Sequence, residues 1–127
     1  MKFSESLKKN QQFRAVYEKG TSCANRYLVV YKMENGLNRN HLGISVSKKV
    51  GNSVVRHHMC RLIRESYRLN EKSIKPGYDL VVVVRPLAKG RSYREIESAL
   101  LHLMRLQDLY RELSSENQDE KDLNRND

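Results

Sequence analysis

The sequence of 127 residues is poor in cysteine, proline and tryptophan. It has two cysteines, Cys23 and Cys60, two prolines and no tryptophan. Two cysteines are too few for a disulfide scaffold, and neither belongs to a CxxC pair or to a His/Cys cluster with zinc-site spacing. We therefore expect free thiols and no protein-bound metal, although a Cys23–Cys60 disulfide remains an open alternative.

Long apolar runs are also missing. The longest, from Leu80 to Val84, is far too short to span a bilayer. The N-terminal segment MKFSESLKKNQQF has no apolar stretch of the kind that secretory signals carry. These absences favour a cytoplasmic protein with no membrane partner.

Positive charge is in excess but unevenly spread. Lysine and arginine number 24 against 15 acids, which gives a net charge of +9 and a pI of about 9.7. Ser114 to Asp127 alone has a net charge of −3, so the preceding residues carry +12. Such a basic balance is typical of nucleic-acid binders. We predict a single nucleic-acid-binding domain over residues 1–113 and an acidic, disordered tail over 114–127.

The pattern of apolar residues predicts an α+β fold, an α–β sandwich in which a small mixed sheet packs with helices in the order α-β-β-β-α-β-α. The expected helices cover 4–19, about 53–69 and 92–113, and the clearest strands cover 25–33, 41–47 and 78–84. Asn52 and Ser53 are both good N-caps for the second helix. Ser92 and Glu95 have capping-box spacing at the start of the third helix, whose expected buried side includes Leu109. An Asn35-Gly36 pair favours a hairpin between the first two of these strands. The valine-rich run 78–84 is apolar on both faces and reads as a central strand, parallel to 41–47. A crossover of that kind is generally right-handed.

The segment SVSKKVGNSVVRHHMCRLIRESYR, from Ser45 to Arg68, is the most informative part of the chain. At about 100° per residue, one arc of its helix is apolar and the opposite arc is basic. The expected core arc contains Val55, Met59, Leu62, Ser66 and Leu69, with Ile63 at its edge. The opposite arc contains Arg56, His57, Cys60, Arg61, Arg64 and Arg68. Guanidinium groups on a rigid face suit phosphates, because each can bond two oxygens at once.

SVSKKVGNSVVRHHMCRLIRE resembles the signature of the bacterial ribonuclease P protein family, in which a Ser-Val-Ser-Lys-Lys strand end leads through a Gly-Asn turn into an arginine-rich helix. The segment GTSCANRYLVVY and the Gly-Tyr-Asp before the valine run also match the family. The resemblance implies a left-handed βαβ crossover, against the general rule. It further implies a protein subunit that helps a catalytic RNA to remove the 5′ leader of precursor tRNA.

The resemblance also implies two RNA-binding surfaces. The residues expected to contact the catalytic RNA are Lys48, Lys49, Asn52, Arg56, His57, His58, Arg61, Arg64 and Arg68. The residues expected to hold the single-stranded leader are Phe13, Tyr17, Arg26, Tyr31 and Lys32. Single-stranded RNA is commonly held by bases resting on aromatic rings, with cations on the backbone. From the residues alone, core packing is the more usual role of aromatics at such spacing, and the leader-binding role of these three follows only from the resemblance.

Three positions depart from the family pattern. His57 replaces the usual Asn, His58 the usual Arg and Cys60 the usual Lys, so the basic arc loses cations that other members have. Histidine is mostly neutral near pH 7 but still donates hydrogen bonds to phosphate. Contacts that the family makes through these positions are therefore in question here.

We predict no catalytic residue in the protein. Adjacent helical residues such as His57 and His58 point about 100° apart, so they do not converge on one ion or substrate, and no acidic cluster stands in the segment to bind Mg²⁺. By the resemblance, Mg²⁺ belongs to the holoenzyme and is bound mainly by RNA. One monomer per catalytic RNA is expected, with precursor tRNA as the second partner. Two alternatives remain: a general RNA-binding protein of ribosomal or chaperone type, and a metal-dependent nuclease.

Overall fold

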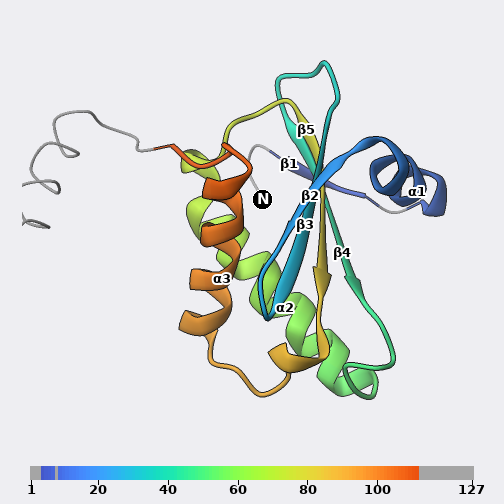
Figure 1. The fold of residues 1–127 in the computed structure, drawn as a ribbon, viewed down its shortest axis with the longest axis vertical. Coiled ribbons are helices and arrows are strands. Elements are labelled where there is room, and N and C mark those ends of the chain that lie inside the picture. Colours follow the sequence, from blue (N-terminus) through green and yellow to red (C-terminus); the bar gives the residue numbers. More distant parts are fainter. Residues whose placement is uncertain (1–3, 8, 112–127) are drawn as a thin grey trace, which may run out of the picture.

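The computed structural model describes residues 4–7 and 9–111, which form one five-stranded mixed sheet and three α-helices (Figure 1). The strands are β1 (Ser4–Ser6), β2 (Thr21–Ala24), β3 (Leu28–Glu34), β4 (Asn40–Val46) and β5 (Tyr78–Val84). The helices are α1 (Asn10–Lys19), α2 (Ser53–Asn70) and α3 (Tyr93–Leu106), with 3-10 turns η1 (Glu71–Ser73) and η2 (Pro86–Ala88). The α+β class predicted from the sequence is confirmed. The predicted acidic tail lies outside the described residues.

The valine-rich strand β5 is the middle strand of the sheet, whose order is β1-β4-β5-β3-β2. It pairs in parallel with β4, where Leu42 faces Leu80, and antiparallel with β3, where Val30 faces Val82. The prediction of a central strand parallel to β4 is confirmed. The predicted β3–β4 hairpin is wrong, because β5 inserts between the two strands that the Asn-Gly turn connects. The handedness of the crossover stays a prediction.

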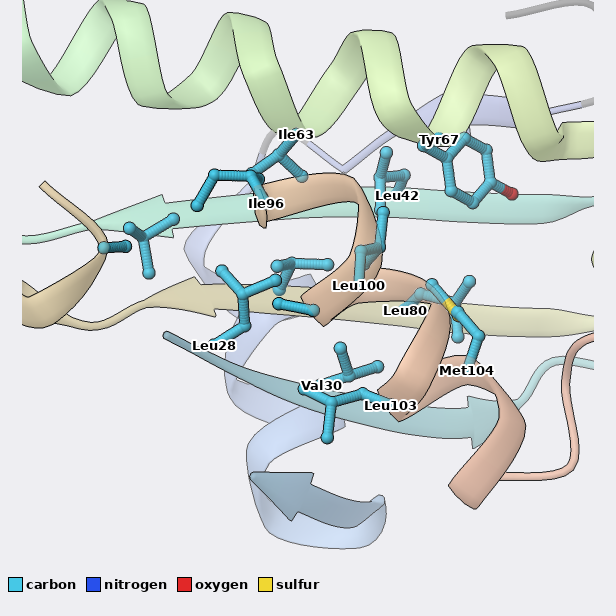
Figure 2. Packing of buried hydrophobic residues seen from close by; sticks show 14 of the residues in the cluster. Leu28, Val30, Leu42, Ile63, Tyr67, Leu80, Ile96, Leu100, Leu103 and Met104 are labelled. Atoms are coloured by element: carbon cyan, nitrogen blue, oxygen red, sulfur yellow. The ribbon is translucent and has the colours of Figure 1, made fainter. Parts of the chain in front are cut away.

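Helices cover the two faces of the sheet unequally (Figure 1). Helices α2 and α3 lie side by side on one face, α2 in contact with β4 and α3 with β2 and β3. Together they bury the main core, in which Ile63 of α2 and Leu100 of α3 meet the sheet residues Leu28 and Leu80 (Figure 2). On the other face α1 buries only Val16, above Val81 of β5. Part of that second face therefore stays open.

Ser4–Ser6 form a strand, although the sequence pattern predicted a helix from Ser4. Strand β1 pairs in parallel with β4, and the Leu7 N–H continues the pairing by donating to the Leu42 carbonyl at 2.9 Å. Because Leu7 is buried against the sheet, α1 begins only at Asn10. The extra strand gives the order β-α-β-β-β-α-β-α.

The buried stripe of α2 is rotated from its predicted position. Met59, Ile63, Ser66 and Tyr67 are buried, whereas Leu69 is 58% exposed. Burial of Tyr67 is possible because its hydroxyl is hydrogen-bonded, at 2.7 Å from Ser4 Oγ and 3.1 Å from Asn40 Nδ2. Burial raises the pKa of Tyr67 above its ordinary value. The phenol thus ties α2 to the edge of the sheet.

Helix α3 begins as predicted and ends earlier. Ser92 caps it by accepting from the Glu95 N–H at 3.2 Å, and Glu95 accepts in return from the Ser92 N–H at 3.1 Å. The predicted extension to residue 113 is wrong, because α3 ends at Leu106 and Asp108 adopts a positive φ of 56°. Leu109 is nevertheless buried, as expected, and its carbonyl accepts from the Lys75 N–H at 2.7 Å.

Candidate RNA interface

A tight turn presents two lysines before the first residue of α2. The Val50 N–H donates to the Ser47 carbonyl at 3.0 Å, and Lys48 and Lys49 between them are exposed. The Asn52 side chain accepts from the Val55 N–H at 3.0 Å and so caps α2, as the sequence predicted. Lys48 and Lys49 therefore stand beside the N-terminal end of the helix, where the helix dipole also favours an anion.

Only glycine fits at position 51 without rearrangement. A Cβ atom there would lie 2.8 Å from the Cβ of Val55, which is closer than such contacts ordinarily come. The close approach lets the turn enter α2 directly. The residue type at position 51 therefore fixes the position of Lys48 and Lys49 relative to the helix.

The outer side of α2 carries an exposed cluster that we call the basic face. It consists of His57, His58, Arg61, Arg64 and Arg68, all of which are exposed. At about 100° per residue, Arg64, His57, Arg68 and Arg61 follow one another at intervals of about 20° around the helix. Among the described residues, neither Arg61 nor Arg64 forms an ion pair. Their guanidinium groups are consequently available to an anionic partner.

Two arginines of the predicted set already have partners within the protein. Arg68 donates to both carboxylate oxygens of Glu65, with an Nε–Oε2 distance of 3.2 Å, and this hydrogen bond holds the pKa of Glu65 below its ordinary value. Arg56 is only half-exposed, and its Nη1 donates to the Gly51 carbonyl at 3.2 Å. Arg61 and Arg64 thus supply the charges of the basic face that no described carboxylate pairs with, whereas Arg68 is partly neutralised.

Cys60 lies at the border between the basic face and the core. Burial raises the pKa of its thiol above the ordinary value, although the nearby Arg64 charge opposes this shift. The side chain is therefore a neutral, half-buried thiol, and both cysteines are free. Position 60 adds no charge to the basic face.

Three aromatic side chains, Phe13, Tyr17 and Tyr31, form a second cluster between α1 and the sheet, which we call the aromatic strip. The Tyr17 and Tyr31 rings meet edge to face with centroids 5.0 Å apart, and Phe13 lies 6.5 Å from Tyr17. Tyr17 is 39% exposed, so its ring is accessible to a ligand. Phe13 packs directly on Gly43, where a Cβ would lie 2.7 Å from the ring. The rings are thus held in place by one another and by the sheet.

The sheet surface beside the aromatic strip, which we call the floor, includes residues that were not predicted to belong to the leader site. The strand register places Ser45, Val83, Val29 and Ala24 in one row across four strands, adjacent to the row that contains Tyr31. Ser45, Val83 and Val29 are half-exposed and Ala24 is exposed. Alternation along β3 indicates that Val29 shares a face with Tyr31. The row across four strands could be recognised only once the strand order was known.

Arg26 and Lys32 do not join the aromatic strip, contrary to the expectation for the leader site. Lys32 points to the opposite face of the sheet, where its Nζ donates to the Gln107 carbonyl at 2.5 Å and lies 5.4 Å from the Tyr78 ring. Alternation along a strand places neighbours of Tyr31 on the other face. Arg26 lies in the β2–β3 turn and lines a hollow next to α3.

No group of three or more His, Cys, Asp or Glu side chains within residues 4–7 and 9–111 is placed to hold a metal ion. In the same part of the chain, no helix has the length and apolar character needed to cross a membrane.

Comparison with known proteins relates the chain to one protein family. The Ribonuclease P family model matches residues 1–107. The chain is 61% identical over 103 residues to the "Ribonuclease P protein component" of Lachnoclostridium phytofermentans, which covers 81% of this chain and 89% of the relative. It is 56% identical over 105 residues to the protein of the same name from Alkaliphilus metalliredigens, covering 83% of this chain and 95% of that one.

Solved structures agree with the sequence relatives. The RNase P protein of Staphylococcus aureus superposes with a TM-score of 0.77 at 38% identity, covering 83% of this chain and 96% of the other. The RNase P protein from Thermotoga maritima gives a TM-score of 0.74 at 31% identity, with 80% and 96% covered. The likeness therefore extends over nearly the whole sheet and its helices.

Proposed function

The chain belongs to the bacterial ribonuclease P protein family, and from this premise we propose that it binds a catalytic RNA through α2 and the 5′ leader of precursor tRNA through the aromatic strip. It is the protein subunit of an endoribonuclease that acts in tRNA processing. In this proposal the protein positions RNA, and the RNA subunit carries out the hydrolysis that releases the leader.

The single observation that carries the proposal is the separation of two chemically different surfaces. The basic face points outward from α2, which covers one face of the sheet, whereas the aromatic strip lies on the other face. Folded RNA presents phosphates, to which Arg61 and Arg64 can donate paired hydrogen bonds. A single strand presents unstacked bases, which suit the Tyr17 ring and the half-open floor beside it. One protein can therefore hold both RNAs at once.

The departures from the family pattern reduce the number of residues expected to contact the catalytic RNA. His57, His58 and Cys60 stand where the family pattern has Asn, Arg and Lys, and Arg68 is shared with Glu65. We infer that Arg61 and Arg64, together with Lys48 and Lys49 at the start of α2, dominate this contact. The lysines bind as flexible point charges and the arginines as oriented forks.

Mg²⁺ enters the proposal as an ion of the complex, held mainly by RNA phosphates. Binding of the basic protein next to RNA reduces phosphate repulsion, so less Mg²⁺ is needed for the same folded RNA. We further propose that one monomer joins one catalytic RNA in the cytoplasm.

Reconstitution with a bacterial ribonuclease P RNA tests the proposal. A precursor tRNA is incubated with RNA alone, protein alone and both together, at Mg²⁺ concentrations from limiting to saturating. We expect faster leader removal with both components, with the largest gain at limiting Mg²⁺, and no cleavage by protein alone.

The other outcomes assign the alternative functions. Cleavage by protein without RNA would indicate a metal-dependent nuclease. Tight binding to RNA with no gain in leader removal at any Mg²⁺ concentration would indicate a general RNA-binding protein. Either result would contradict the proposed role.

A further inference from the structure

A second concentration of arginine lies away from α2, around a surface hollow of about 490 Å³. We call it the α3 hollow. Its lining comes from the β2–β3 turn and from the first two-thirds of α3. The lining residues are Asn25, Arg26, Tyr27, Arg94, Glu95, Ser98, Ala99 and His102. Neither the basic face nor the aromatic strip shares any of these side chains.

Two of the guanidinium groups at the α3 hollow lie near one aromatic ring. Arg26 lies 5.9 Å and Arg91 5.6 Å from the centre of the Tyr27 ring. Arg94 is exposed on the same rim, and Glu95, paired with Arg91 at 3.7 Å, is the one acid in the lining. Three like charges held near a single carboxylate repel one another, and a bound anion would relieve that repulsion.

The turn that carries Arg26 is held rigidly. The Asn25 side-chain oxygen accepts from the N–H groups of Tyr27 and Leu28 at 3.1 and 3.0 Å, and its Nδ2 donates to the Ala99 carbonyl at 3.0 Å. Arg85 adds a fourth bond, from Nη1 to the Asn25 carbonyl at 2.8 Å. The turn is therefore fixed to α3 before any ligand arrives, which lowers the entropy lost on binding.

The α3 hollow and the basic face lie on different helices. Helix α2 packs against β4, whereas α3 packs against β3 and the edge strand β2, on the other side of the central strand (Figure 1). The lining of the α3 hollow includes no residue of α2, so the two surfaces offer different side chains to phosphates.

We propose that the α3 hollow is a second RNA-contact surface, which binds backbone phosphates of structured RNA through Arg26, Arg91 and Arg94. The Tyr27 ring is already engaged by two guanidinium groups, so it is poorly placed to stack a base, and the contact is independent of sequence. This inference rests on the proposed function. The phosphates come either from the catalytic RNA or from the body of the tRNA.

The test compares two doubly substituted full-length proteins. Arg26→Ala with Arg94→Ala removes two charges at the α3 hollow, and Arg39→Ala with Lys72→Ala removes two exposed charges elsewhere. Affinity is measured against salt in two arms, protein with ribonuclease P RNA alone, and holoenzyme with mature tRNA. A second pair, Arg26→Gln with Arg94→Gln, removes the two charges but keeps unbranched polar side chains, and thermal unfolding checks that every variant is folded.

Relative to the control pair, we expect the hollow variants to lose about tenfold in affinity near 0.1 M salt in one arm. The slope of log affinity against log salt concentration should become shallower by about two. A loss in the first arm assigns the phosphates to the catalytic RNA, and a loss in the second assigns them to tRNA. Equal behaviour of hollow and control variants in both arms would overturn the inference. The unsubstituted protein distinguishes failure of this inference from failure of the proposed function. If the proposed function is wrong, the unsubstituted protein does not stimulate leader removal. If only this inference is wrong, it still does.

Discussion

The basic face of α2 and the aromatic strip under α1 hold their functional groups in opposite ways. Arg61 and Arg64 are exposed, and no contact to a described carboxylate orients them. Phe13, Tyr17 and Tyr31 are fixed by ring contacts and by a seat on Gly43. We therefore expect the first surface to act through charge and to adapt to its ligand, and the second to act through shape. Salt should weaken the first strongly and the second little.

The largest effect is expected on the basic face. Replacing both Arg61 and Arg64 by alanine should weaken binding to ribonuclease P RNA by about 100-fold, because hydrogen bonds from charged donors contribute about 1.5 kcal/mol or more each. The salt slope should fall by about two. Filter binding over a range of salt concentrations measures both quantities. An unchanged slope would show that the two guanidinium groups do not contact phosphate.

A smaller and differently selective effect is expected on the aromatic strip. Tyr17→Ala should weaken holoenzyme binding to precursor tRNA by about tenfold, because base–aromatic stacking contributes about 1–3 kcal/mol. Mature tRNA, which lacks the leader, should bind as before. Tyr17→Phe keeps the ring and serves as the matched control. If Tyr17→Ala weakens both tRNAs equally, the leader does not lie on this strip.

A gain of charge tests the departure at Cys60. Cys60→Lys should tighten binding to the catalytic RNA by about fivefold at low salt, because the lysine stem can lie along the half-buried site while the ammonium reaches solvent. Cys60→Ser, which adds no charge, should leave the affinity unchanged. Equal affinities for the lysine and serine variants would place position 60 outside the RNA contact.

The smallest effect concerns the Glu65–Arg68 pair. Glu65→Gln should tighten binding to the catalytic RNA by about threefold, since an exposed ion pair is worth at most about 1 kcal/mol and its loss frees Arg68. The lowered Glu65 pKa keeps the pair intact near neutral pH, and the pair is lost as pH falls through that value. Adding Arg68→Ala should cancel the gain. A gain that survives the second substitution would mean that Arg68 makes no contact.

Much of the fold followed from local sequence signals. The Asn52 cap, the Ser92–Glu95 capping box and the doubly buried valine strand each depend on neighbouring residues alone, and all three are confirmed. Strand pairing depends on tertiary contacts instead. The Asn35-Gly36 turn joins β3 to β4 but says nothing of β5, which enters between them from a distant part of the sequence.

The short strand β1 and the rotation of α2 are linked through the buried hydroxyl of Tyr67. Strand β1 is a polar three-residue segment without alternation, so its pattern carries no strand signal. Its Ser4 hydroxyl and Asn40 satisfy the buried Tyr67 hydroxyl, which turns Tyr67 inward and leaves Leu69 exposed. A helical projection ranks leucine above tyrosine for burial and has no access to partners that are distant in the sequence.

The candidate sites divide along the same line. The arginine arc could be predicted because helix geometry alone brings its members together. Alternation along β3 is enough to place Lys32 on the face opposite to Tyr31, whereas Arg26 could not be excluded without the position of α3. The row from Ser45 to Ala24 required the full strand order.

The ratio of holoenzyme affinities for precursor and mature tRNA tests the separation of the two surfaces most directly. It is measured with protein saturating the catalytic RNA, for the parent chain, for Tyr17→Ala, and for Arg61→Ala with Arg64→Ala. We predict that Tyr17→Ala lowers the ratio by about tenfold, while the arginine variant keeps the parent ratio once its RNA is saturated. A ratio that falls equally in both variants, or in neither, would contradict this prediction.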